Sequence, residues 1–258
     1  MACYVTSDIH GCYEQFIRLL HKISFSQDDT LYILGDIIDR GPDSVDMIRW
    51  VMQAPPNVHF MLGNHEQMML DDTHGDYRTM RIEPDSTWDI NGGAETATQM
   101  LYGLSSSERQ MFFNMCRNAN VCEIIRVNGR MFILTHAGLV LEPGMTINNM
   151  MQYQDAFSLL WARDEWFCSD SVPPALTVFG HTPTDIIVRK AKRFGTPRLK
   201  PSQLNAAPGS ILMFNNRIAI DGGCYFGHRL NCIRLDDGKQ FWVPGPQQFD
   251  RFDDFALL

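Results

Sequence analysis

Short apolar runs recur along the chain, and six of them end in a polar cluster. The runs cover residues 2–6, 31–34, 58–62, 131–135, 176–179 and 217–220. Short apolar runs bounded by turn residues are typical of covered β-strands. Because open α/β sheets bind their ligands beyond the carboxyl ends of their strands, the loops after these runs are the candidate site. We therefore predict an α/β fold of mixed elements, with a site built from strand-end loops.

Helical spacing and turn residues account for much of the chain between these strands. Apolar residues at helical spacing predict one helix around residues 13–23, and a second helix is expected near residues 44–52. Turn residues predict three hairpins, within residues 121–135, within residues 211–220 and around residues 236–238.

The 258 residues suffice for one α/β domain with a full core, so we predict a single domain over residues 1–258. Residues 71–118 break the pattern of strands and are predicted to form a mostly helical excursion beside the site. Within it, Ser105 and Glu108 have the spacing of a capping box. Residues 247–258 are expected to form a peripheral tail.

Composition and charge limit the partners and the cellular compartment that we expect for this protein. The net charge of −8 disfavours a general binder of nucleic acid or of anionic membranes, and no apolar run is long enough to span a membrane. The first residues enter a predicted strand at once, which leaves no room for a signal peptide. Seven cysteines without a C-x-x-C pair indicate free thiols in a reducing compartment. We expect a cytoplasmic protein without a nucleic-acid or membrane partner.

One segment has the opposite charge. Residues 189–200 contain six lysines and arginines and no acidic residue. We favour a solvated loop for this segment. The alternative is a docking surface for an anionic substrate.

The loop Gly35-Asp36-Ile37-Ile38-Asp39-Arg40-Gly41 is the centre of the candidate site. It follows an apolar strand and places two carboxylates and a guanidinium within five residues. Carboxylates so close together repel each other unless a positive charge lies between them. We interpret Asp36 as a bridge between two metal ions, with Asp39 and Arg40 acting beside it.

Oxygen and nitrogen ligands follow the other strands as well. The six candidate metal ligands are Asp8, His10, Asp36, Asn64, His136 and His181. One histidine at a strand end is more often a satisfied core or surface residue, but the clusters occur together. A set of carboxylate, imidazole and amide groups suits Mn²⁺, Fe or Zn²⁺. Two divalent ions against two carboxylates leave a positive pocket for a phosphate group.

Three motifs carry a resemblance to a known family. The segments Asp8-Ile9-His10-Gly11, Gly35 to Gly41 and Gly63-Asn64-His65-Glu66 resemble the signature motifs of the phosphoprotein phosphatase family of metallophosphoesterases. Gly63 to Met69 and the Trp161-Ala162-Arg163 triplet look most similar to the phage-lambda and bacterial serine/threonine protein phosphatases. The resemblance implies a calcineurin-like metallophosphoesterase fold, with a central β-sandwich of mixed sheets flanked by helices.

The resemblance also implies a role for each matched residue. The first metal would be held by Asp8, His10 and Asp36, and the second by Asp36, Asn64, His136 and His181. Phosphate oxygens would be bound by Arg40, Asn64 and Arg163, because planar guanidinium groups suit phosphate. His65 would protonate the leaving group, and Asp39 would orient that imidazole.

The expected reaction is direct hydrolysis of a phosphomonoester. Two metal ions, most simply Mn²⁺, would lower the pKa of a bridging water, and the resulting hydroxide would attack phosphorus in line. No covalent phospho-enzyme is required. The substrate would be a phosphorylated protein or peptide carrying phosphoserine or phosphothreonine, with phosphotyrosine as a further substrate.

Two other functions fit part of the sequence. A symmetrical diadenosine tetraphosphate hydrolase would suit the motif at residues 8–13 and the segment at residues 221–225. Against it, that related family resembles Gly-Asn-His-Asp where this chain has Glu66, and it usually lacks the acid that Asp39 supplies. A non-catalytic phosphopeptide-binding module is disfavoured because all six ligands and His65 are present.

Overall fold

Two five-stranded sheets form the centre of the protein. The structure, a computed structural model, describes residues 1–247, so the predicted tail lies outside the described residues except for its first residue. The first sheet has the order β10-β9-β1-β2-β3 and the second the order β4-β5-β6-β8-β7. The strands are β1 Cys3–Thr6, β2 Thr30–Ile33, β3 Val58–Phe60, β4 Cys122–Val127, β5 Arg130–Thr135, β6 Leu176–Phe179, β7 Leu212–Phe214, β8 Arg217–Ala219, β9 Arg229–Arg234 and β10 Gln240–Pro244.

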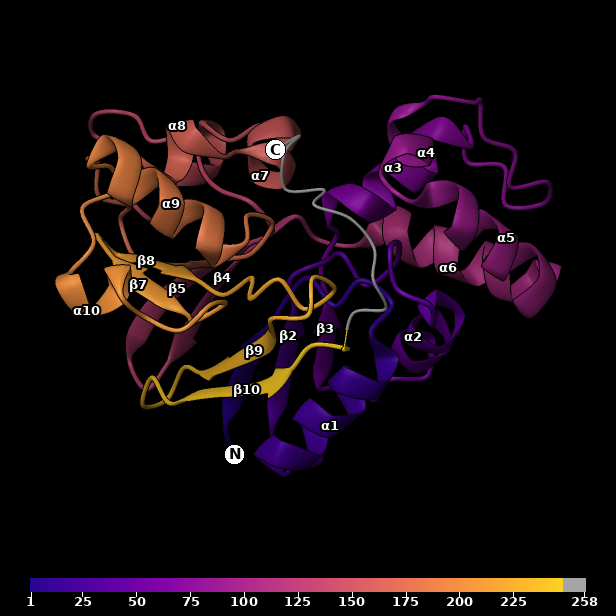
Figure 1. The fold of residues 1–258 in the computed structure, drawn as a ribbon, viewed down its shortest axis with the longest axis horizontal. Helices are drawn as coiled ribbons and strands as arrows, with labels where there is room; N and C mark the ends of the chain where they lie inside the picture. The colour runs from indigo at the N-terminus through magenta and orange to yellow at the C-terminus, as the bar shows by residue number, and fades with distance from the viewer. Residues whose placement is uncertain (248–258) are drawn as a thin grey trace.

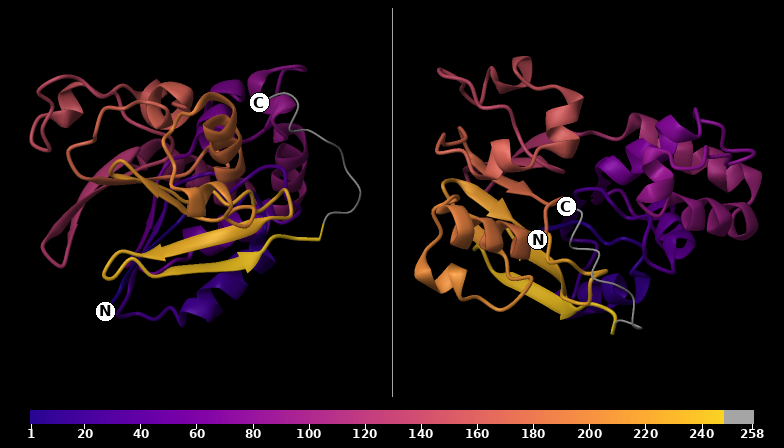
Figure 2. Two further views of the ribbon diagram at one scale, coloured as in Figure 1. Left: turned by 60° about the vertical axis from the view of Figure 1, so that its left-hand side comes forward. Right: turned by 45° about the horizontal axis from the view of Figure 1, so that its top comes forward.

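Each sheet is mixed and has three neighbouring parallel strands. These are β1, β2 and β3 in the first sheet, and β5, β6 and β8 in the second. Antiparallel pairs complete the sheets: β9 with β1, β10 with β9, β4 with β5 and β7 with β8. The helix α1 packs against β9 and β10 at one side of the first sheet (Figure 2). Parallel strands have their carboxyl ends at one edge of a sheet, so each sheet contributes three loops to one edge.

Three apolar clusters show that the sheets are stacked between helices. One cluster lies between the sheets and joins Val5 and Leu34 of the first to Leu134 and Val178 of the second. The second cluster covers the outer face of the first sheet, and the third covers that of the second. The predicted calcineurin-like architecture, a β-sandwich of mixed sheets flanked by helices, is therefore confirmed.

Most of the helices, from α3 to α10, fall into two groups. In Figure 1, α3 to α6 gather on the side of the first sheet and α7 to α10 on the side of the second. The helices are α1 Tyr13–Ile23, α2 Ser44–Met52, α3 Asn64–Asp72, α4 Thr87–Ile90, α5 Gly93–Gly103, α6 Ser106–Asn118, the 3₁₀-helix η1 Met150–Gln152, α7 Ala156–Trp161, α8 Asp164–Phe167, α9 Thr184–Phe194 and α10 Pro201–Leu204.

Most predicted elements are present, and one expectation is wrong. The helix at residues 44–52, the capping box at Ser105 and the three hairpins are confirmed. The basic segment is not a loop over its first half, because α9 runs through it to Phe194. Ile186, Ile187 and Ala191 are buried on one face of α9, so the cations occupy the opposite face of an amphipathic helix. No helix among residues 1–247 has the length and apolarity to cross a membrane.

Candidate functional site

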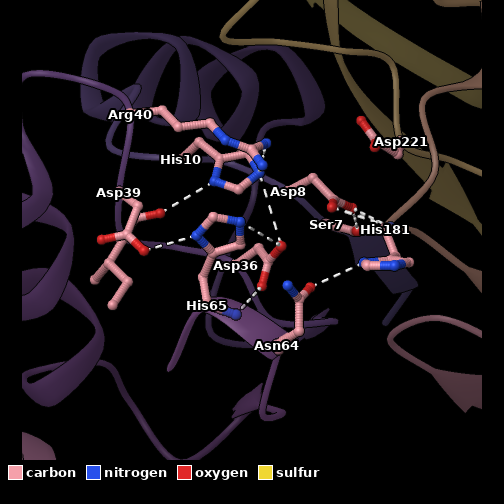
Figure 3. A network of polar contacts seen from close by, with 12 residues as sticks. Ser7, Asp8, His10, Asp36, Asp39, Arg40, Asn64, His65, His181 and Asp221 are labelled. Carbon is pink, nitrogen blue, oxygen red and sulfur yellow. Dashed lines mark hydrogen bonds and ion pairs between the residues drawn. The ribbon is translucent and has the colours of Figure 1, made fainter. Parts of the chain in front are cut away.

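The predicted ligands meet at the edge where the parallel strands end. The loops after β1, β2, β3, β5 and β6 supply Asp8 with His10, Asp36, Asn64, His136 and His181 in turn. All six side chains are buried. Figure 3 shows five of them, without His136, pointing into one small volume together with His65 and Arg40. The sequence prediction that separate strand ends build one site therefore agrees with the structure.

Asp36 lies between two groups of ligand atoms. Its Oδ2 is 3.5 Å from His136 Nε2, 3.7 Å from His10 Nε2 and 3.9 Å from His65 Nε2. Within residues 1–247, two sets of potential ligand atoms lie close enough together to hold a metal ion. One set comes from His10, Asp36 and His65, and the other from Asp36, His136 and His181. A carboxylate shared by two groups is what a pair of adjacent metal ions requires.

The hydrogen bonds of His136 indicate whether its ring can bind a cation. Its Nδ1 lies 2.6 Å from the carbonyl oxygen of Leu34, which can only accept, so this nitrogen donates. The lone pair of Nε2 on the neutral ring then faces Asn64 Oδ1 at 2.8 Å and the Asp36 carboxylate. Acceptors facing one another repel unless a cation joins them. His181 agrees, because its buried Nε2 has no hydrogen-bond partner within the described chain.

His10 has the same tautomer but a different neighbour. Its Nδ1 lies 3.1 Å from the carbonyl oxygen of Ile38, and its Nε2 accepts a hydrogen bond of 2.9 Å from Arg40 Nη1. This Nε2 can bind either the guanidinium or a metal ion, but not both. Arg40 must therefore turn away from His10 when that nitrogen ligates a metal.

Burial sets the ionisation of these ligands. It raises the pKa of Asp8 and Asp36 well above the usual carboxyl range, and nearby acidic groups add to the effect. It lowers the pKa of His10 and His181 well below the usual imidazole value, helped at His10 by the positive charge of Arg40 and at His181 by that of Arg163. Neutral imidazoles keep a lone pair for a metal, and a bound cation favours the ionised carboxylates.

Asp8 lies in the site but in neither group of close ligand atoms. Both of its carboxylate oxygens accept from the backbone N–H of His181 at 3.0 Å, and Ser7 Oγ donates to Oδ2. Asp8 thus connects the β1 loop to the β6 loop. The assignment of Asp8, with His10 and Asp36, to the first metal stays a prediction; among close ligand atoms, His65 lies beside His10 and Asp36.

Asp221 is a site residue that the sequence analysis did not assign. It follows β8 as Asp8 follows β1, and this parallel position is the signal that could have identified it. Its side chain is buried, burial raises its pKa to about 6, and its charge acts on both Asp8 and Arg163. Figure 3 places it beside Asp8 and His181. Asp221 therefore adds negative charge to the side of the site formed by the second sheet.

His65 is held by a carboxylate and an indole. Its Nδ1 lies 2.6 Å from Asp39 Oδ2, and the same oxygen accepts a hydrogen bond of 2.8 Å from Trp88 Nε1. Burial raises the pKa of Asp39 to about 7, and the hydrogen bonds from Thr96 and Trp88 act against this shift. With Nδ1 bound to Asp39, the Nε2 of His65 faces Asp36 and can exchange a proton there. No local sequence signal marked Trp88, which comes from the helical excursion.

The side chain of Glu66 holds the loop of residues 35–41 in place. Its carboxylate accepts from the backbone N–H groups of Asp36 and Ile37 at 2.9 Å and of Gly63 at 3.0 Å. The side chain is fully buried. Three hydrogen bonds to one carboxylate fix the β2 and β3 loops to each other, so Glu66 positions Asp36 without facing the substrate.

Arg163 turns toward the site. Its Nη1 lies 3.5 Å from Thr182 Oγ1, directly after His181 in the chain. Burial lowers its pKa and the nearby Asp221 raises it. Asp164, the neighbour expected of a surface arginine, pairs with Lys190 instead. Arg163 thus comes from the segment between α7 and α8, and the charges of Asp36 and Asp8 act on it.

The sequence comparisons match this chain to phosphoesterases. A sequence profile described as calcineurin-like phosphoesterase matches residues 1–229. A symmetrical bis(5'-nucleosyl)-tetraphosphatase of Chromobacterium violaceum is 27% identical, with 95% of each chain covered. An asymmetrical bis(5'-nucleosyl)-tetraphosphatase of Bacillus velezensis is also 27% identical, with 97% of this chain and 95% of the relative covered.

Two solved structures share the fold. One is described as that of a candidate diadenosine tetraphosphatase, with a TM-score of 0.60, 21% identity and coverage of 95% of this chain and 94% of that one. The other is a protein serine/threonine phosphatase from Saccharomyces cerevisiae, with a TM-score of 0.58, 15% identity and coverage of 98% and 82%. At these identities the likeness concerns the fold alone.

Proposed function

The chain belongs to the calcineurin-like phosphoesterase family, whose members are metal-dependent hydrolases, and from this premise we propose that it hydrolyses bis(5'-nucleosyl) tetraphosphates. The observation that carries the proposal is the similarity to bis(5'-nucleosyl)-tetraphosphatases over nearly the whole chain. It reverses the order of preference that the sequence motifs suggested, in which a protein phosphatase came first.

The two residues that favoured a protein phosphatase do not face the substrate. Glu66 bonds only backbone groups of the β2 and β3 loops, and Asp39 bonds His65 and Trp88. Both side chains are fully buried. A difference at Glu66 changes how the loops are held together, so it carries little information about which phosphate compound enters the site; Asp39 acts only through His65.

The charges of the site suit a polyphosphate. When bound, two divalent ions supply positive charge and lower the pKa of coordinated water. Arg40 and Arg163 add two guanidinium groups whose charges act on the same carboxylates of the site, and together they can bind several phosphate oxygens. We propose Mn²⁺ for both ions, since the donors are carboxylate, imidazole and amide groups. We also propose a cytoplasmic location, because nucleotide pools are found there.

A phosphoprotein phosphatase is the second candidate, and the pair of His65 with Asp39 favours it. An alkoxide leaving group is nearly as basic as hydroxide, whose conjugate acid has a pKa of about 15.7, and it needs a proton as it departs. A nucleoside diphosphate is a much weaker base and departs without one. A buried imidazole held by a carboxylate is therefore of most use with a phosphoserine or phosphothreonine substrate.

A paired assay distinguishes the two functions. The purified chain, loaded with Mn²⁺, is given diadenosine tetraphosphate and a phosphothreonine peptide in separate reactions, and kcat/KM is measured for each. We expect the dinucleotide to be preferred, and chromatography of its nucleotide products identifies the bond that is cleaved. A preference for the phosphopeptide, or inactivity toward the dinucleotide, would overturn the proposal.

A further inference from the structure

An exposed aromatic side chain lies close to the metal ligands. Phe157 is 69% exposed and belongs to none of the apolar clusters formed by the described residues. Its ring is stacked on that of Trp161, with centroids 6.5 Å apart and planes at 16°. Trp161 in turn meets the ring of His181 edge-on at 6.1 Å. The exposed ring of Phe157 is thus linked through the ring of Trp161 to His181, a candidate metal ligand.

The helix that carries both rings is fixed to the site. Phe157 and Trp161 stand four residues apart on α7 and so share one face. Asp155 caps the helix by accepting from the backbone N–H of Ser158 at 2.6 Å. The backbone N–H of Ala137, next to His136, donates to the carbonyl oxygen of Leu159 at 2.9 Å. The position of Phe157 relative to the metal ligands is therefore set by hydrogen bonds.

We propose that Phe157 is a stacking platform for one nucleobase of the substrate, and that it makes the site selective for purine dinucleotides. This inference rests on the proposed function. A base has an apolar face like that of the phenyl ring, and stacking needs no particular hydrogen-bonding pattern. With a phosphate at the ligand cluster, the nucleoside end of an extended nucleoside diphosphate reaches across His181 and Trp161 to the exposed ring.

A purely structural role explains the arrangement less well. Trp161 packs against the apolar cluster on the outer face of the first sheet, so its position does not depend on Phe157. Phe157 adds only an exposed side-chain pair on one helix, and such a pair contributes little to stability. A large apolar side chain that contributes little to packing, fixed beside a site for polyphosphate, is what base recognition requires.

The test compares three variants with the wild-type enzyme on two substrates, diadenosine tetraphosphate and diuridine tetraphosphate, in Mn²⁺. Phe157→Leu removes the aromatic face, and Phe157→Trp keeps one. Phe194→Leu is the matched control, because Phe194 is likewise exposed but lies at the end of α9. Circular dichroism and metal content confirm that each variant is folded and loaded.

We expect Phe157→Leu to lower kcat/KM for the diadenosine compound by about 5- to 150-fold, mainly through KM. The loss should be smaller for the diuridine compound, because a pyrimidine stacks over less area, so the ratio of the two kcat/KM values falls. Phe157→Trp should restore the ratio, and Phe194→Leu should match the wild type.

Two results would overturn the platform while leaving the proposed function intact. One is an unchanged adenine-to-uracil ratio in Phe157→Leu, and the other is an equal loss in Phe157→Leu and Phe157→Trp. A wild-type enzyme that cleaves neither dinucleotide overturns the proposed function and the platform with it. If Phe157→Leu, assayed in parallel on a phosphothreonine peptide, loses activity on the peptide but on neither dinucleotide, the ring is assigned to peptide binding instead.

Discussion

Replacing Asp39 by asparagine tests whether His65 acts as the proton donor. The substitution keeps the size of the side chain but removes the charge from the oxygen that lies 2.6 Å from His65 Nδ1. A hydrogen bond to a charged group contributes about 1.5–3 kcal/mol, and that contribution is largest when the imidazole is protonated. At about 1.4 kcal/mol for each factor of ten, the protonated form should be less populated by roughly 10- to 100-fold.

The assay is a series of substituted phenyl phosphates whose leaving phenols differ in pKa. Asp39→Asn should lower kcat by about 10- to 100-fold for basic phenols and by much less for p-nitrophenol, which needs no proton. A plot of log kcat against leaving-group pKa should therefore become steeper. Asp43→Asn is the control, since Asp43 lies in the same loop and its side chain makes no capping hydrogen bond. An equal loss for every phenol would refute the reasoning, because Asp39 would then act on the metal site as a whole.

Further predictions concern the metal site and the thiols. Treatment with a chelator should abolish hydrolysis while circular dichroism stays unchanged, and Mn²⁺ should restore the activity. Gly180→Ala should weaken Mn²⁺ binding, measured by calorimetry, by about tenfold or more, because a Cβ there would collide with the Asp8 carboxylate. Gly129→Ala, with open space around it, should bind Mn²⁺ normally. Burial raises the pKa of Cys3 and Cys122 to about 12, so at pH 8 both should stay protonated and react with Ellman's reagent far more slowly than in guanidinium.

The ligand set could be predicted because it depends on local information. Asp8, Asp36, Asn64, His136 and His181 each follow an apolar strand, and parallel pairing then brings the strand ends together. A sequence reveals both the strand and the residue after it. Long-range packing is needed for everything else at the site.

Three features illustrate what the sequence did not reveal. Trp88 reaches Asp39 from a helix 49 residues further along the chain, and no local pattern marks that contact. The basic segment became part of α9 because Ile186 and Ile187 bury an apolar face, which a count of charges overlooks. Glu66 appeared to indicate the substrate, but the structure places it under the loops. Glu66 therefore indicates how the loops are held together, and not which phosphate compound enters the site.

The backbone of the site shows why its geometry belongs to the paired sheets. Six non-glycine residues of the site have φ between 47° and 70°, namely Asp8, His10, Asp36, Asp39, Arg40 and His181. Such left-handed residues cost about 1–3 kcal/mol each and persist only when their surroundings enforce them. Here the β1 and β2 loops enforce one another, since the N–H groups of His10 and Gly11 donate to the carbonyl oxygens of Asp36 and Ile37 at 2.9 Å. The strand pairing thus continues into the loops and holds the ligand residues in place, so the sheets offset the strain of these backbone conformations.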